Sequence, residues 1–397
     1  MSTAPQFITK SFLENVLRDH FKDDALKILN FRTSSVGEVG DNFTSLLLRI
    51  KITYAKKGGG EGEYPVIAKI FPEDEEAASV ITATKGFDSE IGVYGDVLPA
   101  MHNLDYHQKV APKSYHVSST PVPILILEDM TFVDYKMPAR IAGLNLRHSL
   151  LLVDKLAYFH AASVAVFEKN PKMSEEFYVG LYGTKEVTDG FFSVGIPSFL
   201  EVCEKSIDLQ EYASKLSYEK IKSKLQDVLQ PSKTFNVLNH GDAWTTNFMF
   251  HYDENGNPTD AILLDFQFSV YGSPLDDLHF FFVVGADLDT KSLGFGHMLS
   301  YYHEALVKHM KFLKTEAKPP TLKELNDEYR SRAAYGLVAA AVGLPMVIAE
   351  SRPDATLGNF LSDGSEGGYR YSCYHNEMYL RHLKLLLPMY DDLGTLD

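Results

Sequence analysis

Two carboxylates and one carboxamide in the second half of the chain are of the residue types that hold a divalent cation against a phosphate. Asp242 and Asn247 stand five positions apart in the segment HGDAWTTNFMF, and Asp265 follows directly after the apolar run AILL. The pair lies in a predicted loop, and Asp265 ends a predicted buried strand. Phosphoryl transfer needs mainly positioning and neutralisation of charge by a metal, which these residue types supply. We therefore expect the three side chains to converge on one point.

The spacing of Asp242 and Asn247 resembles the catalytic loop of kinases, in which an Asp accepts the proton of the acceptor hydroxyl and an Asn holds a metal ion. Asp265, followed by Phe266, resembles the Asp of the D-F-G element, which holds magnesium against the triphosphate. The resemblance implies that Asp242 is the catalytic base and that Asn247 and Asp265 bind the metal. It also implies that His240 is a structural residue packed within the loop.

The N-terminal part of the chain has the pattern of a helix followed by three strands. Residues 9–22 have helical periodicity, with Ser11 and Glu14 spaced as a capping box. Residues 31–39, 44–54 and 64–71 alternate or run apolar, as strands do. Three antiparallel strands followed by a further helix are the start of a kinase small lobe.

A glycine-containing segment, GEVGDNF at positions 37–43, separates the first two predicted strands. Glycines in a hairpin let the backbone approach phosphates, so we assign Gly40 and Asn42 to nucleotide binding. An ordinary β-turn is the commoner meaning of such a segment. The segment also departs from the G-x-G-x-x-G pattern of protein kinases. The assignment therefore depends on residues elsewhere in the chain.

Lys69 ends the third predicted strand among apolar neighbours, where a lysine either lies at a strand edge or serves an anionic ligand. It resembles the strand lysine of kinases that contacts the α- and β-phosphates. Glu90, 21 residues later, lies in a helical pattern and suits the ion-pair partner of that lysine. A solvated helix glutamate is the alternative, and the downstream catalytic loop favours the pair.

The run PILILEDM, at 123–130, is predicted to be a buried strand that leads into a hinge. Backbone groups of Glu128 and Met130 would hold the adenine there. Residues 144–162 are predicted to form a long central helix, on which His160 is a packed, hydrogen-bonded residue. The helical segment 165–235 either shapes the acceptor pocket or is a structural layer, and the sequence does not decide between the two.

Only eight residues, 266–273, separate Asp265 from the sequence PLDDL. That is too short for the activation segment on which the peptide substrates of protein kinases dock. The short connection therefore indicates a small-molecule acceptor. Asp277 is predicted to lie in the first turn of a helix and to accept hydrogen bonds from the backbone of the catalytic loop.

Composition narrows the class of protein further. The 397 residues carry a net charge of −15, which argues against a nucleic-acid or anionic-membrane partner. The chain has two cysteines and no C-x-x-C pattern, which argues against a zinc site or a disulfide framework. The first ten residues have no signal-peptide pattern, and the apolar run 333–349 is predicted to be a buried helix. We expect a cytoplasmic protein with no obligate protein partner.

Taken together, these motifs resemble the ecdysteroid kinase-like (CHK kinase-like) family, which is related to choline and aminoglycoside kinases. The resemblance extends over about residues 30–385. It implies an α+β, bilobal protein-kinase-like fold with a small lobe at 1–127, a hinge at 128–133 and a mainly helical lobe at 134–397. It also implies ATP- and Mg²⁺-dependent phosphorylation of a small-molecule alcohol, which in some members is an ecdysteroid and in others a xenobiotic or its conjugate. An insect origin is expected.

Three other functions compete with this prediction. His240 and Asp242 together with His297 would spell a two-His-one-carboxylate iron site of an oxygenase, but this leaves Asn247 and Lys69 unexplained. A catalytically degraded kinase that binds an apolar ligand would be expected to lack one of the transfer residues, and all are present. A choline- or ethanolamine-type kinase remains the alternative within the same chemistry.

Overall fold

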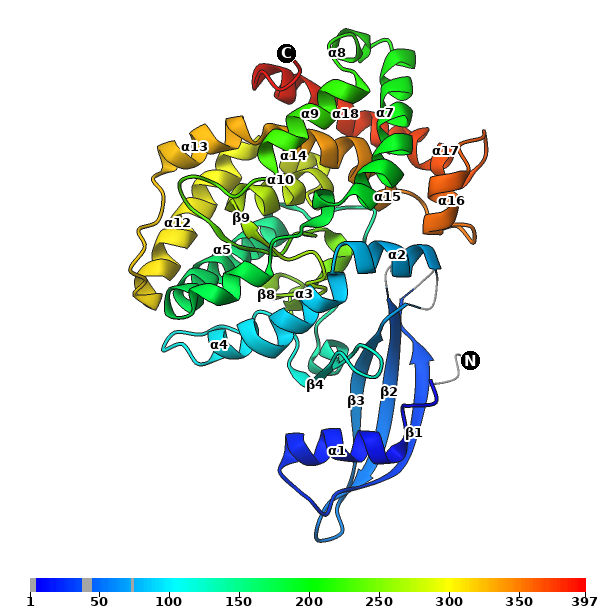
Figure 1. Ribbon diagram of the computed structural model, residues 1–397, viewed down its shortest axis with the longest axis vertical. Coiled ribbons are helices and arrows are strands. Elements are labelled where there is room, and N and C mark those ends of the chain that lie inside the picture. Colours follow the sequence, from blue (N-terminus) through cyan, green and yellow to red (C-terminus); the bar gives the residue numbers. More distant parts are fainter. Residues whose placement is uncertain (1–4, 38–44, 73–74) are drawn as a thin grey trace.

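The structure is a computed structural model that describes residues 5–37, 45–72 and 75–397. It has two lobes, with an elongated sheet and one helix at one end and a larger, mainly helical body at the other (Figure 1). The expected bilobal, protein-kinase-like fold is confirmed: an antiparallel sheet forms the small lobe, and the catalytic loop lies in the helical lobe.

The small lobe is built on a five-stranded antiparallel sheet in the order β1-β2-β3-β5-β4. Its strands are β1 (Lys27–Ser35), β2 (Leu46–Ala55), β3 (Glu61–Ile70), β4 (Ser114–Ser118) and β5 (Ile124–Glu128). Helix α1 (Lys10–Phe21) packs against β1 and β4.

Alternation along the strands decides which side chains face the cleft between the lobes. On β3, Val66, Ala68 and Ile70 join the core beneath α1, so Ile67 and Lys69 point to the opposite face. On β5 the same alternation sends Ile124 and Ile126 into the small-lobe core and Leu125 and Leu127 into the core of the large lobe. The period of two therefore delivers Lys69 to the interlobe cleft.

Two local predictions in this lobe were wrong. The residue that caps α1 is Thr9, whose hydroxyl accepts from the Phe12 N–H at 3.1 Å, and not Ser11. Glu14 instead accepts from the Ile28 N–H at 3.0 Å, which ties α1 to the first strand. That strand begins at Lys27 rather than Phe31. As an edge strand it is exposed over most of its length, so its sequence lacks a clear apolar alternation.

A nearly continuous helical segment connects the sheet to the large lobe. It consists of α2 (Glu75–Ala83), α3 (Gly86–Gly92), a π-helical turn at Val93–Val97 and α4 (Leu98–His102). Glu90 lies on α3 and is fully buried. Val93, Tyr94 and Val97 pack into the large core, which fixes the helix and the glutamate that it carries.

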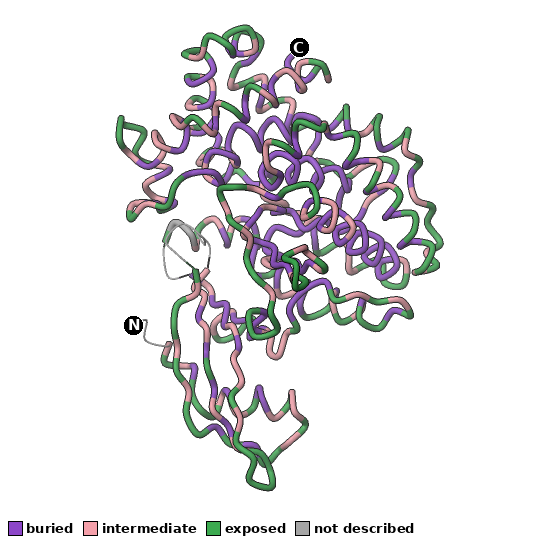
Figure 2. The backbone as a smooth tube through the Cα atoms, turned by 180° about the vertical axis from the view of Figure 1, so that it is seen from behind, coloured by how far each residue is buried: buried purple, intermediate pink, exposed green. Residues whose placement is uncertain are grey.

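The large lobe is organised around two long helices, α5 (Leu146–Lys169) and α12 (Phe295–Leu313), which pack together. Among the described residues, α5 is the one helix long and apolar enough to cross a membrane, and 83% of its most apolar stretch is buried in the protein. Figure 2 shows buried backbone concentrated in this lobe. The other helices of eight or more residues are α7 (Ser193–Lys205), α9 (Tyr218–Val228), α10 (Pro274–Val284), α13 (Leu322–Ser331) and α18 (Glu377–Asp392).

The predicted buried helix at 333–349 is confirmed as α14 (Ala333–Val338), a π-helical turn at Ala339–Gly343 and α15 (Leu344–Val347). Short helices α6 (Lys185–Val187), α8 (Gln210–Ala213), α11 (Leu288–Ser292), α16 (Leu357–Ser362) and α17 (Tyr369–Tyr374) complete the lobe. Two small antiparallel ribbons hold the catalytic loop: β6 (Val237–Asn239) pairs with β9 (Val270–Gly272), and β7 (Phe248–Tyr252) pairs with β8 (Pro258–Leu263).

Candidate active site

Lys69 lies between two carboxylates where strand β3 borders the cleft. Its Nζ is 2.6 Å from Glu90 Oε2 and 2.6 Å from Asp265 Oδ1. The predicted Lys69–Glu90 ion pair is therefore present, and the glutamate is buried rather than solvated. Burial alone would lower the pKa of Lys69, but the two carboxylates raise it, so the lysine stays charged. A fixed cation at this position can bind a phosphate oxygen.

Asp265 is held in a left-handed backbone conformation, with φ of 65°. Such a conformation is uncommon for a residue other than glycine and clusters at functional sites. It directly follows Leu264, whose N–H donates to the Asn247 carbonyl oxygen at 2.8 Å. This bond ties the strand end to the catalytic loop and brings Asp265 beside Asn247.

The catalytic loop itself is shaped by Gly241, which has φ of +81°. A Cβ atom at this position would lie 1.9 Å from the Phe268 carbonyl oxygen, so a side chain does not fit. The loop can therefore pack directly against the backbone that follows Asp265. Only glycine combines the positive φ with this close approach.

Asp277, in the first turn of α10, anchors the loop as predicted. Its Oδ2 accepts from the His240 N–H at 2.6 Å, and its Oδ1 accepts from the Gly241 N–H at 2.8 Å. His160 Nε2 lies 3.0 Å from the same carboxylate, and its Nδ1 lies 2.8 Å from the Tyr302 hydroxyl. Burial would raise the pKa of Asp277, but the bond and charge of His160 lower it below the ordinary value. An ionised Asp277 thus holds the loop in place.

Asp242 and Asn247 are joined within the loop. The Asn247 Nδ2 donates to Asp242 Oδ2 at 2.9 Å and to the Asp242 carbonyl oxygen at 2.9 Å. Burial, followed by the charge of Asp265, raises the pKa of Asp242 to about 8, although hydrogen bonds from Asn247 and Trp244 oppose the rise. A carboxylate with a raised pKa near neutrality is suited to accept a proton from a hydroxyl.

Two cavities meet at these residues. The larger, of about 910 Å³, extends from the Gly37 region over Lys69 and the strand end at Leu127 to Arg140. The smaller, of about 150 Å³, is lined by Asp242, Trp244, Gln267 and apolar side chains of the large lobe. Asn247 and Asp265 line both cavities. A ligand in one would therefore meet a ligand in the other at these two side chains.

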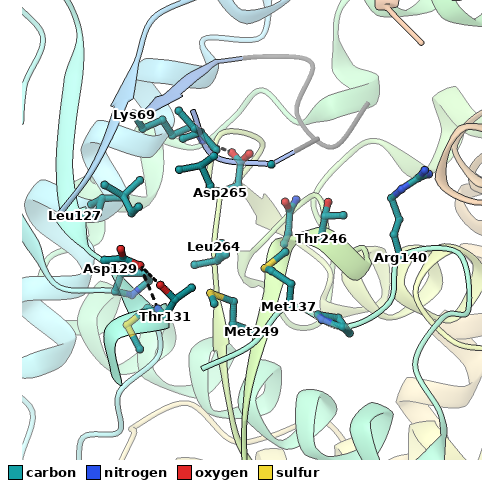
Figure 3. Close-up of a pocket in the computed structure, with 18 of the residues that line it drawn as sticks. Lys69, Leu127, Asp129, Thr131, Met137, Arg140, Thr246, Met249, Leu264 and Asp265 are labelled. Atoms are coloured by element: carbon teal, nitrogen blue, oxygen red, sulfur yellow. Dashed lines mark hydrogen bonds and ion pairs between the residues drawn. The ribbon is translucent and has the colours of Figure 1, made fainter. Parts of the chain in front are cut away.

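Figure 3 shows how the larger cavity is arranged: Lys69 and Asp265 point toward each other on one side, and Arg140 lies on the other. Leu127, Leu264 and Met249 supply apolar walls below Lys69 and Asp265 in this view. An apolar slot next to a fixed cation has the character of a nucleotide site, with room for a base and for phosphates.

The predicted hinge residues line the same cavity. Glu128 ends β5, and Met130, which is buried, begins a 3₁₀ turn at Met130–Val133. The Glu128 side chain is bound by Lys109 Nζ at 2.7 Å and by the Lys113 N–H at 3.1 Å, so it serves the protein rather than a ligand. The other predicted nucleotide contacts, Gly40 and Asn42, lie outside the described residues.

The donor set fits a hard cation that keeps water or phosphate ligands. Within the residues that the structure describes, no group of three or more His, Cys, Asp or Glu side chains could hold a metal. Because the Asn247 amide nitrogen bonds Asp242, the amide oxygen is the end of this side chain that could bind a cation. One carboxylate and one amide oxygen suit Mg²⁺, which is bound with few protein ligands and substrate phosphates.

The competing iron site is contradicted by the geometry of His240. This residue is fully buried, its Nε2 lies 2.8 Å from the Leu264 carbonyl oxygen, and its Nδ1 accepts from the Asp242 N–H at 3.3 Å. Both ring nitrogens are therefore used within the loop. His297 lies on the exposed side of α12. His240 is the packed structural residue that was expected.

Two residues that sequence reasoning missed belong to these cavities. Arg140 lines the larger cavity and donates to the Val347 carbonyl oxygen at 2.7 Å and to the Ala349 carbonyl oxygen at 2.8 Å. Since Val347 lines the smaller cavity, Arg140 joins the walls of both. Tyr182 lines the smaller cavity from the segment 165–235, whose part in that pocket the sequence left open. No local pattern marks either residue, because only long-range packing brings them to the site.

The fold and the site together define a kinase-like phosphotransferase of the small-molecule type. The sequence matches the ecdysteroid kinase-like family over residues 39–315, and the chain belongs to that family. No curated protein matches the sequence.

Solved structures with a similar chain course share little sequence with this protein. An ethanolamine kinase of Plasmodium vivax is 12% identical, with a TM-score of 0.43, over 98% of this chain and 91% of its own. A choline kinase of Streptococcus pneumoniae is 13% identical, with a TM-score of 0.42, over 94% of this chain and 99% of its own. An aminoglycoside phosphotransferase in a ternary complex with streptomycin and ATP is 14% identical, with a TM-score of 0.35, over 90% of this chain and 95% of its own.

Proposed function

We propose that this protein transfers the γ-phosphoryl group of ATP, bound with Mg²⁺, to the hydroxyl of an apolar small-molecule alcohol. The observation that carries the proposal is the meeting of the two cavities at Asn247 and Asp265, next to Asp242. A nucleotide in the larger cavity would present its terminal phosphate where an alcohol in the smaller cavity ends. That arrangement is what in-line transfer requires.

Under this proposal, backbone groups after β5 and side chains of the cleft would hold the nucleotide. The Glu128 N–H donates to the Lys113 carbonyl oxygen at 2.8 Å, so we assign adenine recognition to the Glu128 carbonyl and the Met130 N–H. Lys69, held by Glu90, binds the phosphates. Asn247 and Asp265 would hold Mg²⁺, which when bound neutralises charge on the phosphates. We accordingly propose that residues 128–133 form a hinge between a nucleotide-binding small lobe and the remainder of the chain.

The acceptor pocket favours an uncharged alcohol. Among the described residues that line the smaller cavity, the charged ones are Asp242 and Asp265, both of which belong to the transfer site. Its other walls are mainly apolar and aromatic, and include Phe191, Phe268 and Phe280. A cationic acceptor of the choline type would rely on carboxylates that the reaction itself uses. A xenobiotic alcohol suits these apolar walls better, and an ecdysteroid, the compound in the family's name, would have to extend beyond a cavity of about 150 Å³.

The chemistry assigned to the protein is modest. Asp242 accepts the proton of the alcohol while the alcohol oxygen forms its bond to the γ-phosphorus and the bond from that phosphorus to the bridging oxygen breaks. The leaving group is ADP. The raised pKa of Asp242 gives the carboxylate enough basicity to take the proton. The positive charge of Lys69 stabilises the negative charge that develops on the phosphates during transfer.

The test is release of ADP and formation of a phosphate ester with MgATP and a panel of alcohols, sterols and glucosides. We expect turnover that needs both magnesium and an apolar alcohol. Binding of nucleotide and ligand without any ester formed would instead indicate a degraded, ligand-sequestering member of the family. Turnover with choline but with no apolar alcohol would contradict the acceptor class.

A further inference from the structure

The hydroxyl group of Tyr182 is buried in the smaller cavity without a hydrogen-bond partner. Tyr182 is 3% exposed, and no group among the described residues bonds its hydroxyl. It lines the cavity together with Asp242, and it lies close enough to feel the charge of that carboxylate. A buried donor without a partner is unfavourable and rare in folded proteins, so its presence in a ligand-sized cavity needs an explanation.

Packing of the Tyr182 ring against its neighbours fixes the position of this hydroxyl. The Tyr182 ring contacts Tyr335 with centroids 5.2 Å apart, Phe192 at 5.6 Å and Phe280 at 6.4 Å. Rings held on three sides have little freedom to turn away. The hydroxyl is thus fixed at the cavity wall before any ligand binds.

Two comparable buried tyrosines of the large lobe have hydrogen-bond partners within the protein. The Tyr374 hydroxyl donates to the Ala341 carbonyl oxygen at 2.9 Å, and the Tyr379 hydroxyl donates to the Ala340 carbonyl oxygen at 2.9 Å. Tyr94 and Tyr390 also have unbonded hydroxyls, but neither lines the smaller cavity. Tyr182 is therefore the tyrosine whose hydroxyl can meet an acceptor molecule.

We propose that the Tyr182 hydroxyl donates a hydrogen bond to a second oxygen of the acceptor, so that the preferred substrate is an apolar alcohol carrying another hydroxyl or carbonyl group. This inference rests on the proposed function and narrows its substrate class. The reacting oxygen is the less suitable partner, because donation to its lone pair would weaken its attack on phosphorus. Asp242 takes the proton of the reacting hydroxyl, and Tyr182 holds the molecule by its other oxygen.

The consequence is selection against monohydric alcohols. A site built to hydrogen-bond a substrate oxygen discriminates strongly against an analogue that lacks it, because the buried group is then left unpaired. The apolar walls hold both kinds of alcohol. Tyr182 distinguishes between them.

The experiment compares the parent with Tyr182→Phe, using cyclohexanol and the 1,2-, 1,3- and 1,4-cyclohexanediols as acceptors with MgATP. For the parent, we expect kcat/KM for at least one diol to exceed that for cyclohexanol by about tenfold. Tyr182→Phe should abolish that advantage, mainly through KM, so that kcat/KM for the preferred diol falls about tenfold more than kcat/KM for cyclohexanol. Equal loss for cyclohexanol and all diols, or no loss for any, would overturn the inference.

A second measurement tests the unpaired hydroxyl without reference to turnover. Tyr182→Phe should unfold at the same temperature as the parent or at a higher one, because no bond within the protein is lost. The matched variant Tyr374→Phe loses its bond to Ala341 and should unfold at a lower temperature. A lowered Tm for Tyr182→Phe, equal to that of Tyr374→Phe, would show an internal partner and contradict the inference. If the parent phosphorylates none of the four acceptors, the result contradicts the proposed function and, with it, this inference.

Discussion

The carboxamide of Asn247 donates to the carboxylate of Asp242 over 2.9 Å, and this bond assigns the two ends of the Asn247 amide to different tasks. The nitrogen fixes the carboxylate that would accept a proton, and the oxygen is the end that could bind a metal ion. Under the proposed mechanism, this one side chain would link proton transfer to metal binding. Its five-residue separation from Asp242 lets a single loop hold both groups.

Replacing Asp242 by Asn should lower turnover by about 10²–10⁴-fold, because the amide cannot accept the proton of the alcohol. Nucleotide affinity should stay near the parent value, since Asp242 lines the smaller cavity and not the larger one. Steady-state turnover and nucleotide titration measure the two effects. The exposed Asp289→Asn is the control for the same chemical change. Parent-like turnover of Asp242→Asn would remove Asp242 from the role of base.

The rate should rise with pH through the titration of Asp242. Its pKa is raised to about 8, so at lower pH the carboxyl holds a proton and cannot act as base. We expect kcat/KM for the alcohol to increase on raising the pH and to level off above about pH 8. In the ternary complex, kcat should reach its plateau at a lower pH, because the positive charge of bound metal favours the ionised carboxylate. A profile that is flat throughout this region would exclude a base with this pKa.

Replacing Asp265 by Ala should change nucleotide affinity in opposite directions with and without magnesium. With magnesium present, affinity should fall by at least about tenfold, because a metal ligand is lost. Without magnesium, affinity should be unchanged or higher, because Asp265 then only repels the phosphates and neutralises Lys69, which lies 2.6 Å away. Isothermal titration of ATP under both conditions measures the difference. The same loss in both conditions would count against metal binding by Asp265.

Replacing Gly241 by Ala should disrupt the catalytic loop. The added Cβ would lie 1.9 Å from the Phe268 carbonyl oxygen, and φ is +81°. We expect the free energy of unfolding to fall by more than about 2 kcal/mol and turnover to be lost. Gly256→Ala is the matched control, because Gly256 has φ of +77° and nothing within 4 Å of its Cβ position. The free energy of unfolding of Gly256→Ala should fall by about 1 kcal/mol, because this variant has the strain of the backbone conformation alone. Equal losses for the two variants would refute the steric argument.

The sequence was sufficient wherever function follows from short-range pattern. The alternation of β3 places Lys69 on the face opposite the small-lobe core, and helical spacing buries Glu90 at the position where it meets that lysine. Asp277 could be assigned to the backbone of the catalytic loop because the first turn of a helix favours a carboxylate. These features depend on backbone periodicity and on a few residues adjacent in the chain.

Local rules failed where two equally suitable residues competed. Ser11 and Glu14 have capping-box spacing, yet Thr9 caps α1, because Glu14 is drawn to the Ile28 N–H and the Arg18 side chain. The start of β1 was misplaced because an edge strand needs no apolar face. The cap was decided by a contact between elements, and the strand start by the place of β1 at the edge of the sheet.

The sequence by itself predicted the transfer chemistry that we propose, because Asp242, Asn247 and Asp265 belong to two short segments, which the small ribbons around the loop join. Only the tertiary structure shows the cavity to which we assign the acceptor. Tyr182, Asp242 and Val347 meet there from segments far apart in the chain. The identity of a pocket wall depends on how helices pack and which way their side chains turn, and no single segment carries that information.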